Sequence, residues 1–506
     1  MSDRVGDRTL RDLLDERASR RPGHPFLVFE DAAGAVREYS YAEFTADVDA
    51  AAAGLADLGV QPGTKVTLHL RHCPAFLFAW FGLATIGGVA VPSNVANTAD
   101  ELRYVLDYSD SELLITEPLL LETAQAAAAG IAAVRHVLRT DESEAWMPAG
   151  GEPPRPRLGS EDPVEILFTS GTTSRPKGVV LTHANCLWSG ERVAAAMTLG
   201  DDARCLTSLP TFHVNAQSVT VLSALTAAGT CILLQEFSAR RFWEQMRAHR
   251  ATQTSLVAMQ LRTLLAQPPA PTDTDHSLER VFYAINVTDD EKKRFEERFG
   301  VALINGYGLS EAMTLVTMAP VFGDRRWPSI GLPLYDRKVR IIGDEGAPPA
   351  AGEIGEIAVQ GVPGRTLFKE YYKDPDATEA ALADGWLHTG DNGWLDEDGY
   401  VFFLDRKKDV IKRAGENISA SEVERVLIEH PAIEEVAVIG VPDPIRDEAV
   451  KAFVVLVEGE GATAEDIAAF CATRLASFKV PTVFEFRESL PNHHRHGIQT
   501  AGERLP

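Results

Sequence analysis

Stretches with the spacing of helices and of strands alternate along most of the chain. Apolar residues recur at helical spacing from Tyr41 to Leu58, and residues 65–70 alternate as a half-buried strand does. Strand-like apolar runs return at 205–213 and 229–234. Such alternation is typical of a sheet whose two faces are covered by helices. The pattern therefore predicts a large N-terminal domain of the α/β class.

A second, smaller unit is predicted toward the C-terminal end. Residues 433–441 and 449–457 are strand-like, and residues 463–477 have the pattern of an amphipathic helix. Ser419 and Glu422 have the spacing of a capping box, which predicts a helix that begins there. We therefore expect a small α+β domain at this end.

The most apolar segment, residues 75–91, approaches the roughly 20 residues that a membrane span needs. Prolines bracket it and three glycines interrupt it, so a buried helix followed by a short strand is the better interpretation. The first dozen residues are rich in charge and lack the apolar core of a signal peptide. We expect no membrane span and a cytoplasmic location.

The composition narrows the range of partners. The 506 residues are 45% hydrophobic and carry a net charge of -24, which argues against nucleic acid or an anionic membrane as the main partner. The five cysteines are scattered without metal-ligand spacing, so they should be reduced packing residues. His493, His494 and His496 show no fourth ligand nearby, and we interpret them as part of a polar tail.

The segment from Thr169 to Gly178, T-S-G-T-T-S-R-P-K-G, follows a strand-like run and predicts a phosphate-binding loop. Its small residues let backbone N–H groups turn toward an anion, and a lysine adds a positive charge. A Walker A loop is disfavoured because the lysine precedes the glycine. The candidate ligands in this loop are Thr169, Ser170, Gly171, Thr172, Thr173 and Lys177.

With R-W-P-S-I-G at 326–331 and I-R-D-E-A-V-K-A-F-V-V-L at 445–456, this loop makes the chain resemble the adenylate-forming superfamily, most of all its carnitine-CoA ligase branch. The resemblance covers nearly the whole chain. It implies activation of a carboxylic acid as acyl-AMP and transfer to CoA, by an N-terminal domain at 1–404, a hinge at 405–408 and a mobile lid at 409–506. It suggests carnitine as the acid substrate, and a bulky biosynthetic acid remains an alternative substrate.

The nucleotide would be held by a strand-to-loop segment after residue 301. Triphosphate chemistry needs a magnesium ion, for which Glu311 with Thr169 is the candidate pair. Tyr307 offers a flat face for adenine. The resemblance implies that Asp391 in H-T-G-D and Arg406 hold the ribose. It also places Asn305 and Gly306 at the nucleotide.

The acyl group and CoA would meet other residues. His213 follows an aromatic residue at a strand end, and the resemblance places it at the acyl pocket, where it would orient or gate. Asn215, Asn286 and Met313 would line the same pocket; Asn286 could instead bond the adenine edge.

For the CoA step, the resemblance places Lys408 at the pivot of the lid. It also implies that the pantetheine arm passes Gly415 and that Glu416 supports the loop around that glycine. Arg446 and Lys451 are either partners of the CoA phosphates or ordinary surface charges.

One departure from the superfamily concerns the lysine near the C-terminus that contacts the carboxylate and the α-phosphate. Aligned from Leu490-Pro491, that position holds Gly497, and no lysine follows Lys479. Losing such a donor typically lowers the rate about a hundred- to a thousandfold. We therefore expect weak or lost adenylation, with acyl-AMP supplied by a separate enzyme, as in the non-adenylating ligases of platensimycin-type biosynthesis.

Two alternatives remain at this point. A complete ATP-dependent ligase would use Arg495 or Lys479 in place of the missing lysine, with ATP and Mg²⁺ beside CoA. A non-catalytic protein would bind acyl-adenylate without turning it over. The features of a CoA channel and hinge favour an enzyme over a binder.

Overall fold

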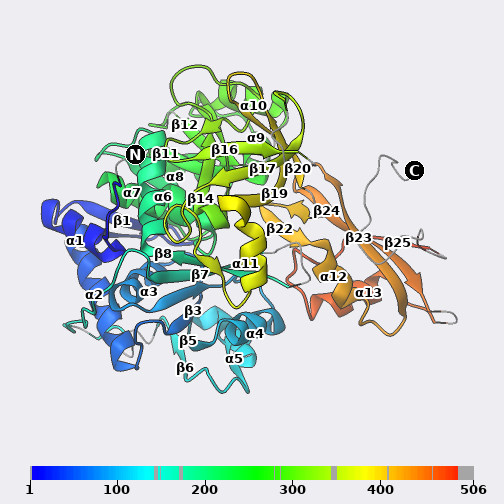
Figure 1. Ribbon diagram of the computed structural model, residues 1–506, viewed down its shortest axis with the longest axis horizontal. Helices are drawn as coiled ribbons and strands as arrows, with labels where there is room; N and C mark the ends of the chain where they lie inside the picture. Colours follow the sequence, from blue (N-terminus) through cyan, green and yellow to red (C-terminus); the bar gives the residue numbers. More distant parts are fainter. Residues whose placement is uncertain are drawn as a thin grey trace. The chain divides into compact units, whose positions relative to one another are not determined.

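The computed structural model describes residues 3–141, 146–148, 150–169, 175–278, 280–284, 287–343, 350–406, 410–457, 460–487 and 490, without the side chains of residues 405, 406 and 421 (Figure 1). The chain divides into two compact units. Among the described residues, the first consists of residues 3–169 and 177–405, and the second of residues 175–176 and those from 406 on.

The sheet that carries the predicted phosphate loop has seven strands in the order β18-β8-β7-β4-β3-β5-β6. Strands β3 to β7 pair in parallel, whereas β8 runs antiparallel to β7 and β18 antiparallel to β8. The helices α4 (Ala99–Tyr108) and α5 (Leu121–Ala128) lie beside β5 and β6 in Figure 1. The strands are β3 Lys65–His69, β4 Val89–Pro92, β5 Ser111–Thr116, β6 His136–Arg139, β7 Pro163–Thr169, β8 Lys177–Thr182 and β18 Glu370–Tyr371.

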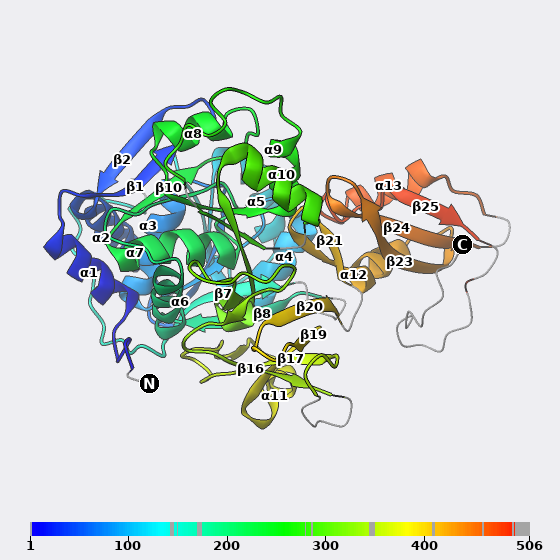
Figure 2. The same cartoon turned by 90° about the horizontal axis from the view of Figure 1, so that it is seen from above.

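A second sheet has nine strands in the order β15-β14-β13-β12-β11-β9-β10-β1-β2, with β1 and β2 at one edge (Figure 2). Its centre from β1 to β13 is parallel, as expected for strands joined by helices. The strands are β1 Pro25–Glu30, β2 Val36–Ser40, β9 Arg204–Thr207, β10 Thr230–Leu234, β11 Gln253–Val257, β12 Arg280–Ala284, β13 Ala302–Leu309, β14 Thr314–Met318 and β15 Leu332–Pro333.

A smaller antiparallel sheet in the order β16-β17-β19-β20 completes the first unit and carries H-T-G-D within β19. Its strands are β16 Lys338–Ile342, β17 Gly355–Gln360, β19 Trp386–Leu395 and β20 Val401–Arg406. The remaining helices of the unit are α1 Leu10–Arg20, α2 Tyr41–Asp57, α3 Pro74–Ile86, α6 His183–Ala196, the π-helix Ala216–Leu222, α7 Ser223–Ala227, α8 Phe242–Ala248, α9 Ala258–Leu265, α10 Asp289–Phe299 and α11 Pro375–Ala381.

The apolar segment at 75–91 forms α3 followed by β4, as predicted. Residues 76–86 are all buried, and Gly82 lets α3 approach α2, since an added Cβ would lie 3.1 Å from the backbone nitrogen of Ala52. Across the described part of the chain, the helices are too short or too polar to cross a membrane.

The strand predicted over 205–213 is shorter in the structure. β9 ends at Thr207, whose hydroxyl accepts a hydrogen bond from the Leu209 amide at 3.0 Å and so turns the chain. The segment up to His213 is therefore a turn rather than a strand.

The second unit is a small α+β fold, orange and red in Figure 1. Its sheet has the order β22-β21-β24-β23, with β25 beside β24. The inner faces of its two helices meet the sheet in one apolar core that includes Val423, Leu427, Ile467 and Cys471. Its elements are β21 Val410–Arg413, β22 Glu416–Ser419, α12 Ala420–Leu427, β23 Ile433–Asp443, β24 Asp447–Leu456, α13 Ala464–Ala472 and β25 Val483–Phe486.

The capping box predicted for α12 is wrong. Ser419 is the N-cap residue, but its side chain makes no capping hydrogen bond. The Glu422 carboxylate instead accepts a hydrogen bond from the Lys479 ammonium at 2.8 Å, and both groups are buried. A buried opposite charge outweighs a local cap, because an unpaired buried carboxylate is strongly unfavourable. The predicted fold class, a large α/β unit with a small α+β unit, is confirmed.

Candidate functional site

The predicted phosphate loop joins two paired strands. Thr169 ends β7, Lys177 begins β8, and the two residues pair in the antiparallel register. The Lys177 ammonium lies 4.9 Å from the centre of the Tyr371 ring, a cation–π arrangement. The loop residues Ser170, Gly171, Thr172 and Thr173 lie outside the described residues.

Tyr371 connects the lysine to the predicted metal ligand. Its hydroxyl donates a hydrogen bond to Glu311 Oε1 at 2.8 Å. Burial raises the pKa of Tyr371, and the neighbouring Glu311 carboxylate raises it further, so this tyrosine stays a neutral donor. Lys177, Tyr371 and Glu311 thus form one contiguous polar run.

The turn that carries Glu311 is held in an uncommon backbone conformation. Met313 has a φ of 41° and Thr314 a φ of 76°, values that non-glycine residues rarely adopt. The Phe368 amide donates to the Glu311 carbonyl at 2.7 Å, and Arg337 donates to the Ala312 carbonyl at 2.5 Å. These bonds hold the turn against its strain.

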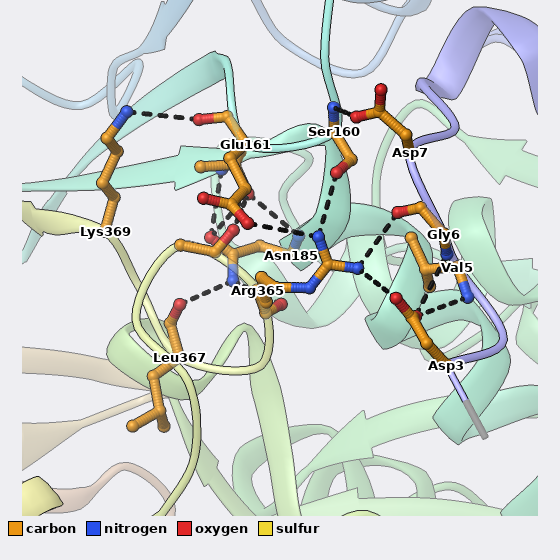
Figure 3. A network of polar contacts seen from close by, with 12 residues as sticks. Asp3, Val5, Gly6, Asp7, Ser160, Glu161, Asn185, Arg365, Leu367 and Lys369 are labelled. Atoms are coloured by element: carbon orange, nitrogen blue, oxygen red, sulfur yellow. Dashed lines mark hydrogen bonds and ion pairs between the residues drawn. The ribbon is translucent and has the colours of Figure 1, made fainter. Parts of the chain in front are cut away.

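The loop that supplies Phe368 and Tyr371 is anchored by a polar network (Figure 3). The Arg365 guanidinium donates to Asp3 at 2.7 Å and to the Ser160 hydroxyl at 3.1 Å. Asn185 of α6 donates to the carbonyls of Arg365 and Leu367 at 2.8 and 2.7 Å. The N-terminal segment and α6 therefore fix the loop from both sides.

β13 continues through Gly306, Tyr307 and Gly308 to Leu309 instead of giving way to a loop at the first glycine. The reason is the close approach of neighbouring chain segments. An added Cβ would lie 2.4 Å from the Phe282 ring at Gly306 and 1.8 Å from the Thr314 carbonyl oxygen at Gly308. Both glycines are therefore required by packing.

Tyr307 and Asp391 come together from two different sheets. The Tyr307 hydroxyl donates to Asp391 Oδ2 at 2.6 Å, and Asp391 is only 1% exposed. Glu356 shapes the turn before Asp391, because it accepts from the Gly390 amide at 2.8 Å and contacts His388 at 3.2 Å. The Arg406 side chain lies outside the described residues.

Asn305 lies one residue before these glycines and has a backbone partner. Its side-chain amide donates to the Ser329 carbonyl at 3.0 Å, and the residue is buried. This bond ties β13 to the R-W-P-S-I-G segment.

Two of the predicted acyl-pocket residues, His213 and Asn215, lie in one turn that contacts β11 and β14. The His213 amide donates to Pro210 O at 3.0 Å, and its ring lies 4.8 Å from the Phe212 ring. Asn215 accepts from the Ser255 hydroxyl of β11 at 2.8 Å, and Thr314 donates to the Val214 carbonyl at 3.1 Å.

Thr314 directly follows Met313, so the turn at 213–215 and the turn after Glu311 are neighbours. Met313 itself is 1% exposed and belongs to the main apolar core. Asn286 lies outside the described residues.

Gly415 lies in a tight hairpin between β21 and β22. Arg413 pairs with Glu416, and the two residues between them, Ala414 and Gly415, have φ values of 53° and 92°. Such a two-residue turn with both φ values positive favours glycine. The backbone thus gives a reason for Gly415 that is independent of a pantetheine channel.

The two predicted CoA-phosphate partners differ in their surroundings. Lys451 has its ammonium 2.6 Å from Glu485 and 4.5 Å from the centre of the Phe453 ring. Arg446 is 53% exposed, lies 3.8 Å from Asp443, and its carbonyl accepts from the Ala414 amide at 2.8 Å. Arg446 is therefore next to the hairpin, whereas Lys451 takes part in a structural ion pair.

The C-terminal residues bear on adenylation. Lys408, Arg495 and Gly497 lie outside the described residues. Lys479 is 7% exposed and pairs with Glu422 inside the second unit. A compensating role for Lys479 is therefore disfavoured by its surroundings.

Sequence reasoning missed Tyr371, Arg337 and Arg365. Each acts through contacts with residues that lie between 25 and 362 positions away in the sequence. Two adjacent tyrosines after a short apolar run were the only local signal for Tyr371.

Residues 14–372 match the family of AMP-binding enzymes, and residues 422–497 match the AMP-binding enzyme C-terminal domain. The chain belongs to the AMP-binding enzyme family. Similar relatives include the crotonobetaine/carnitine–CoA ligases of Salmonella agona (strain SL483) and Salmonella typhimurium (strain LT2), each 42% identical over 516 residues that cover 97% of this chain and 98% of the relative.

Two solved structures extend the comparison. A double mutant of o-succinylbenzoate CoA synthetase from Bacillus subtilis, bound to a product analogue, is 27% identical with a TM-score of 0.87, covering 97% of this chain and 98% of that chain. The amide bond synthetase of Marinactinospora thermotolerans is 27% identical with a TM-score of 0.84, covering 96% and 97%. The comparisons assign an acid–thiol ligase of the acyl-CoA synthetase family. They favour the complete reaction over the half-reaction expected from Gly497, and they do not show a loss of adenylation.

Proposed function

We propose that this chain is an ATP-dependent, AMP-forming acyl-CoA ligase for a small carboxylic acid of the carnitine and crotonobetaine type. The carboxylate displaces pyrophosphate from ATP to give acyl-AMP, and the CoA thiolate then displaces AMP to give the thioester. The observation that carries this proposal is similarity to crotonobetaine/carnitine–CoA ligases through the whole length of both chains. Those relatives also suggest the class of acid.

Contacts within the first unit support the proposed nucleotide roles. The buried Asp391 carboxylate, oriented by the Tyr307 hydroxyl, would accept the ribose hydroxyls together with Arg406. The Tyr307 ring would lie against adenine, with Asn305 and Gly306 fixing the strand beneath it.

The phosphates would lie at the hairpin of β7 and β8. The backbone of residues 169–173 and the Lys177 ammonium supply donors and positive charge there. Glu311, with Thr169, fits a magnesium ion, because such sites need only one or two carboxylates besides phosphate oxygens. The ion would neutralise charge on those oxygens, and Tyr371 would keep the Glu311 carboxylate oriented.

The thioester step would use the second unit. Gly415 and Glu416 in the β21–β22 hairpin would admit the pantetheine arm, and Arg446 beside that hairpin would contact a CoA phosphate. Lys408 stays a predicted pivot residue, and the boundaries at 404 and 409 stay predictions. His213, Asn215, Asn286 and Met313 would line the acyl group.

A second candidate is the thioester half-reaction alone, on acyl-AMP from a separate enzyme, with a bulky biosynthetic acid as a further substrate class. Two observations favour it. Gly497 replaces the superfamily lysine, and the last lysine of the chain, Lys479, is held by Glu422.

One pair of assays separates these candidates. Purified protein is tested for ATP–pyrophosphate exchange with crotonobetaine, carnitine and bulky acids, and for acyl-CoA formation from the synthetic acyl-AMP and CoA. The complete ligase gives both activities. Acyl-CoA formation without exchange supports the half-reaction, and acyl-AMP binding without either activity supports a non-catalytic binder.

A further inference from the structure

The chain after His213 does not continue as an ordinary helix. Residues Ala216–Leu222 form a π-helix, and all seven are buried. π-Helices are rare because their hydrogen bonds pack less well than those of α-helices, and they concentrate at functional sites. This one begins directly after Asn215, at the turn that carries His213 and Asn215.

One side chain of the π-helix ties two functional segments together. Gln217 Nε2 donates to Glu165 Oε1 at 2.6 Å and to the Thr211 carbonyl at 2.9 Å. Glu165 lies on β7, four residues before Thr169 at the start of the phosphate loop. Thr211 begins the turn that leads to His213. Gln217 therefore links the phosphate-loop strand to the predicted acyl-pocket turn.

The polar groups of this link lower the stability of the folded protein. Among the described residues, Glu165 Oε2, Gln217 Oε1 and Thr211 Oγ1 are buried without a hydrogen-bond partner. Each such atom typically costs about 1–3 kcal/mol, and apolar side chains of the same shape would avoid it. Stability alone therefore does not account for these three polar groups.

The charge state of Glu165 is also set by burial. Burial raises the pKa of its carboxyl to about 8, whereas the bond from Gln217 acts in the opposite direction. The Cys186 thiol of α6 interacts electrostatically with Glu165, and burial raises the pKa of that thiol well above its usual range. Near neutral pH the pair is thus a neutral acid beside an amide, and the link is an uncharged hydrogen bond rather than a charge-assisted one.

The same turn is held at two further points. Ser255 donates to Asn215, and Thr314 donates to the Val214 carbonyl. Gln217 attaches the turn to β7, the strand that leads to the phosphate loop. Its loss would let the turn shift relative to β7 while the other two contacts remain.

We infer that Gln217 is a positioning residue: with Glu165 it fixes His213 and Asn215 relative to the strand that leads to the phosphate loop, and so sets the fit of the acyl group beside the nucleotide. This inference rests on the proposed function, since it takes the turn at 213–215 as part of the acyl site.

The test compares a double variant, Glu165→Leu with Gln217→Leu, with the single variant Glu165→Gln. The double variant removes all polar atoms of the pair at once, so a structural role predicts unchanged or higher stability and no other effect. Glu165→Gln keeps an oxygen that accepts from Gln217, so it is the matched control.

The first readout needs no substrate. The ring resonance of His213, in protein with ¹³C-labelled histidine and assigned with His213→Gln, should move in the double variant and stay in place in the control. An unmoved resonance in the folded double variant overturns the inference. If the double variant does not fold, Gln217→Met at pH 6.5 replaces it, since Met has similar volume and Glu165 is neutral there.

The second readout is kinetic. With the acid that the wild type uses best, KM for the acid should rise about tenfold or more in the double variant, because small misplacements are costly in rate and binding. KM for CoA should stay within about twofold. An equal change in KM for the acid and KM for CoA indicates a structural role only. So does a loss of activity that parallels a fall in the thermal unfolding midpoint. Wild-type protein without acyl-CoA formation contradicts the proposed function instead, and the histidine resonance still decides the inference.

Discussion

The hydroxyl of Tyr307 donates a hydrogen bond to the buried carboxylate of Asp391 at 2.6 Å, across two sheets of the first unit. Tyr307 is on β13 of the nine-stranded sheet and Asp391 is on β19 of the four-stranded sheet. The contact therefore depends on how the two sheets pack against each other. The bond helps to orient the carboxylate, which is what recognition of two adjacent hydroxyl groups requires.

Tyr307→Phe should weaken AMP binding about three- to tenfold, because the ring remains and only the orienting bond is lost. Asp391→Ala should weaken it more, since the acceptor itself is removed. Calorimetric titration with AMP measures both. Tyr400→Phe is the matched control, because its hydroxyl donates to the Asp324 carbonyl at 2.6 Å and that bond lies outside the candidate site. Equal affinities for Tyr307→Phe and wild type would refute the orienting role.

Adjacent tyrosines allow a second comparison. Tyr371 donates to Glu311, whereas Tyr372 donates to Asp110 at 2.8 Å, so Tyr371→Phe and Tyr372→Phe remove the same type of bond. Tyr371→Phe should raise the Mg²⁺ concentration needed for half-maximal pyrophosphate exchange about threefold or more, because the carboxylate loses its orienting donor. It should leave acyl-CoA formation from supplied acyl-AMP unchanged. A similar effect in Tyr372→Phe would point to a general loss of stability.

Glu165 makes stability depend on pH. Its folded-state pKa of about 8 lies above the unfolded value near 4.5, so between these values the folded state binds more protons than the unfolded state. The free energy of unfolding should therefore fall as pH rises from about 4.5 to about 8, by about 1.4 kcal/mol per pKa unit of the shift. Glu165→Gln should remove this slope in denaturant titrations at pH 5, 7 and 9. A slope that persists unchanged would show that Glu165 does not titrate in this range.

Local sequence was sufficient for elements whose residues carry their own signal. The apolar spacing of α2, and the proline and glycine that bound α3, mark those helices within a few residues. The phosphate loop stays a prediction from contiguous residues, because residues 170–174 lie outside the described part of the chain.

Contacts made over long sequence distances were not predictable in the same way. Glu422 looked like a capping residue until Lys479, 57 positions later, supplied a buried partner. Arg337 and Gln217 carry no local signal and Tyr371 only a weak one, because each acts on a segment that only the fold brings near. The end of β13 beyond Gly306 likewise depends on long-range contacts, since Phe282 and Thr314 leave no room for a side chain at Gly306 and Gly308.

Two explanations for the glycine at 415, its backbone conformation and a pantetheine channel, can be distinguished by mutation. Gly415→Ala at a φ of 92° should destabilise the second unit by about 1 kcal/mol whatever the substrate does. Ala414→Gly relieves strain at a φ of 53° without adding bulk, so the pair Ala414→Gly with Gly415→Ala offsets most of that cost. If pantetheine passes Gly415, KM for CoA should still rise in the stability-matched pair. Normal KM for CoA there would assign the glycine to the turn alone.

The ion pair of Lys479 and Glu422 decides whether the last lysine of the chain takes part in adenylation. Lys479→Met alone should cost about 3–5 kcal/mol, because it leaves a buried carboxylate unpaired, and any loss of activity in it would be ambiguous. The double variant Lys479→Met with Glu422→Leu removes both charges and should fold nearly as well as the wild type. Pyrophosphate exchange in this double variant should equal the wild-type rate, because the ammonium of Lys479 is already paired with Glu422.

A fall of about tenfold or more in exchange, with acyl-CoA formation from acyl-AMP retained, would show instead that Lys479 leaves its partner to support adenylation. Gly497→Lys made in the same double variant completes the comparison, since any gain in exchange then comes from the restored lysine and not from Lys479.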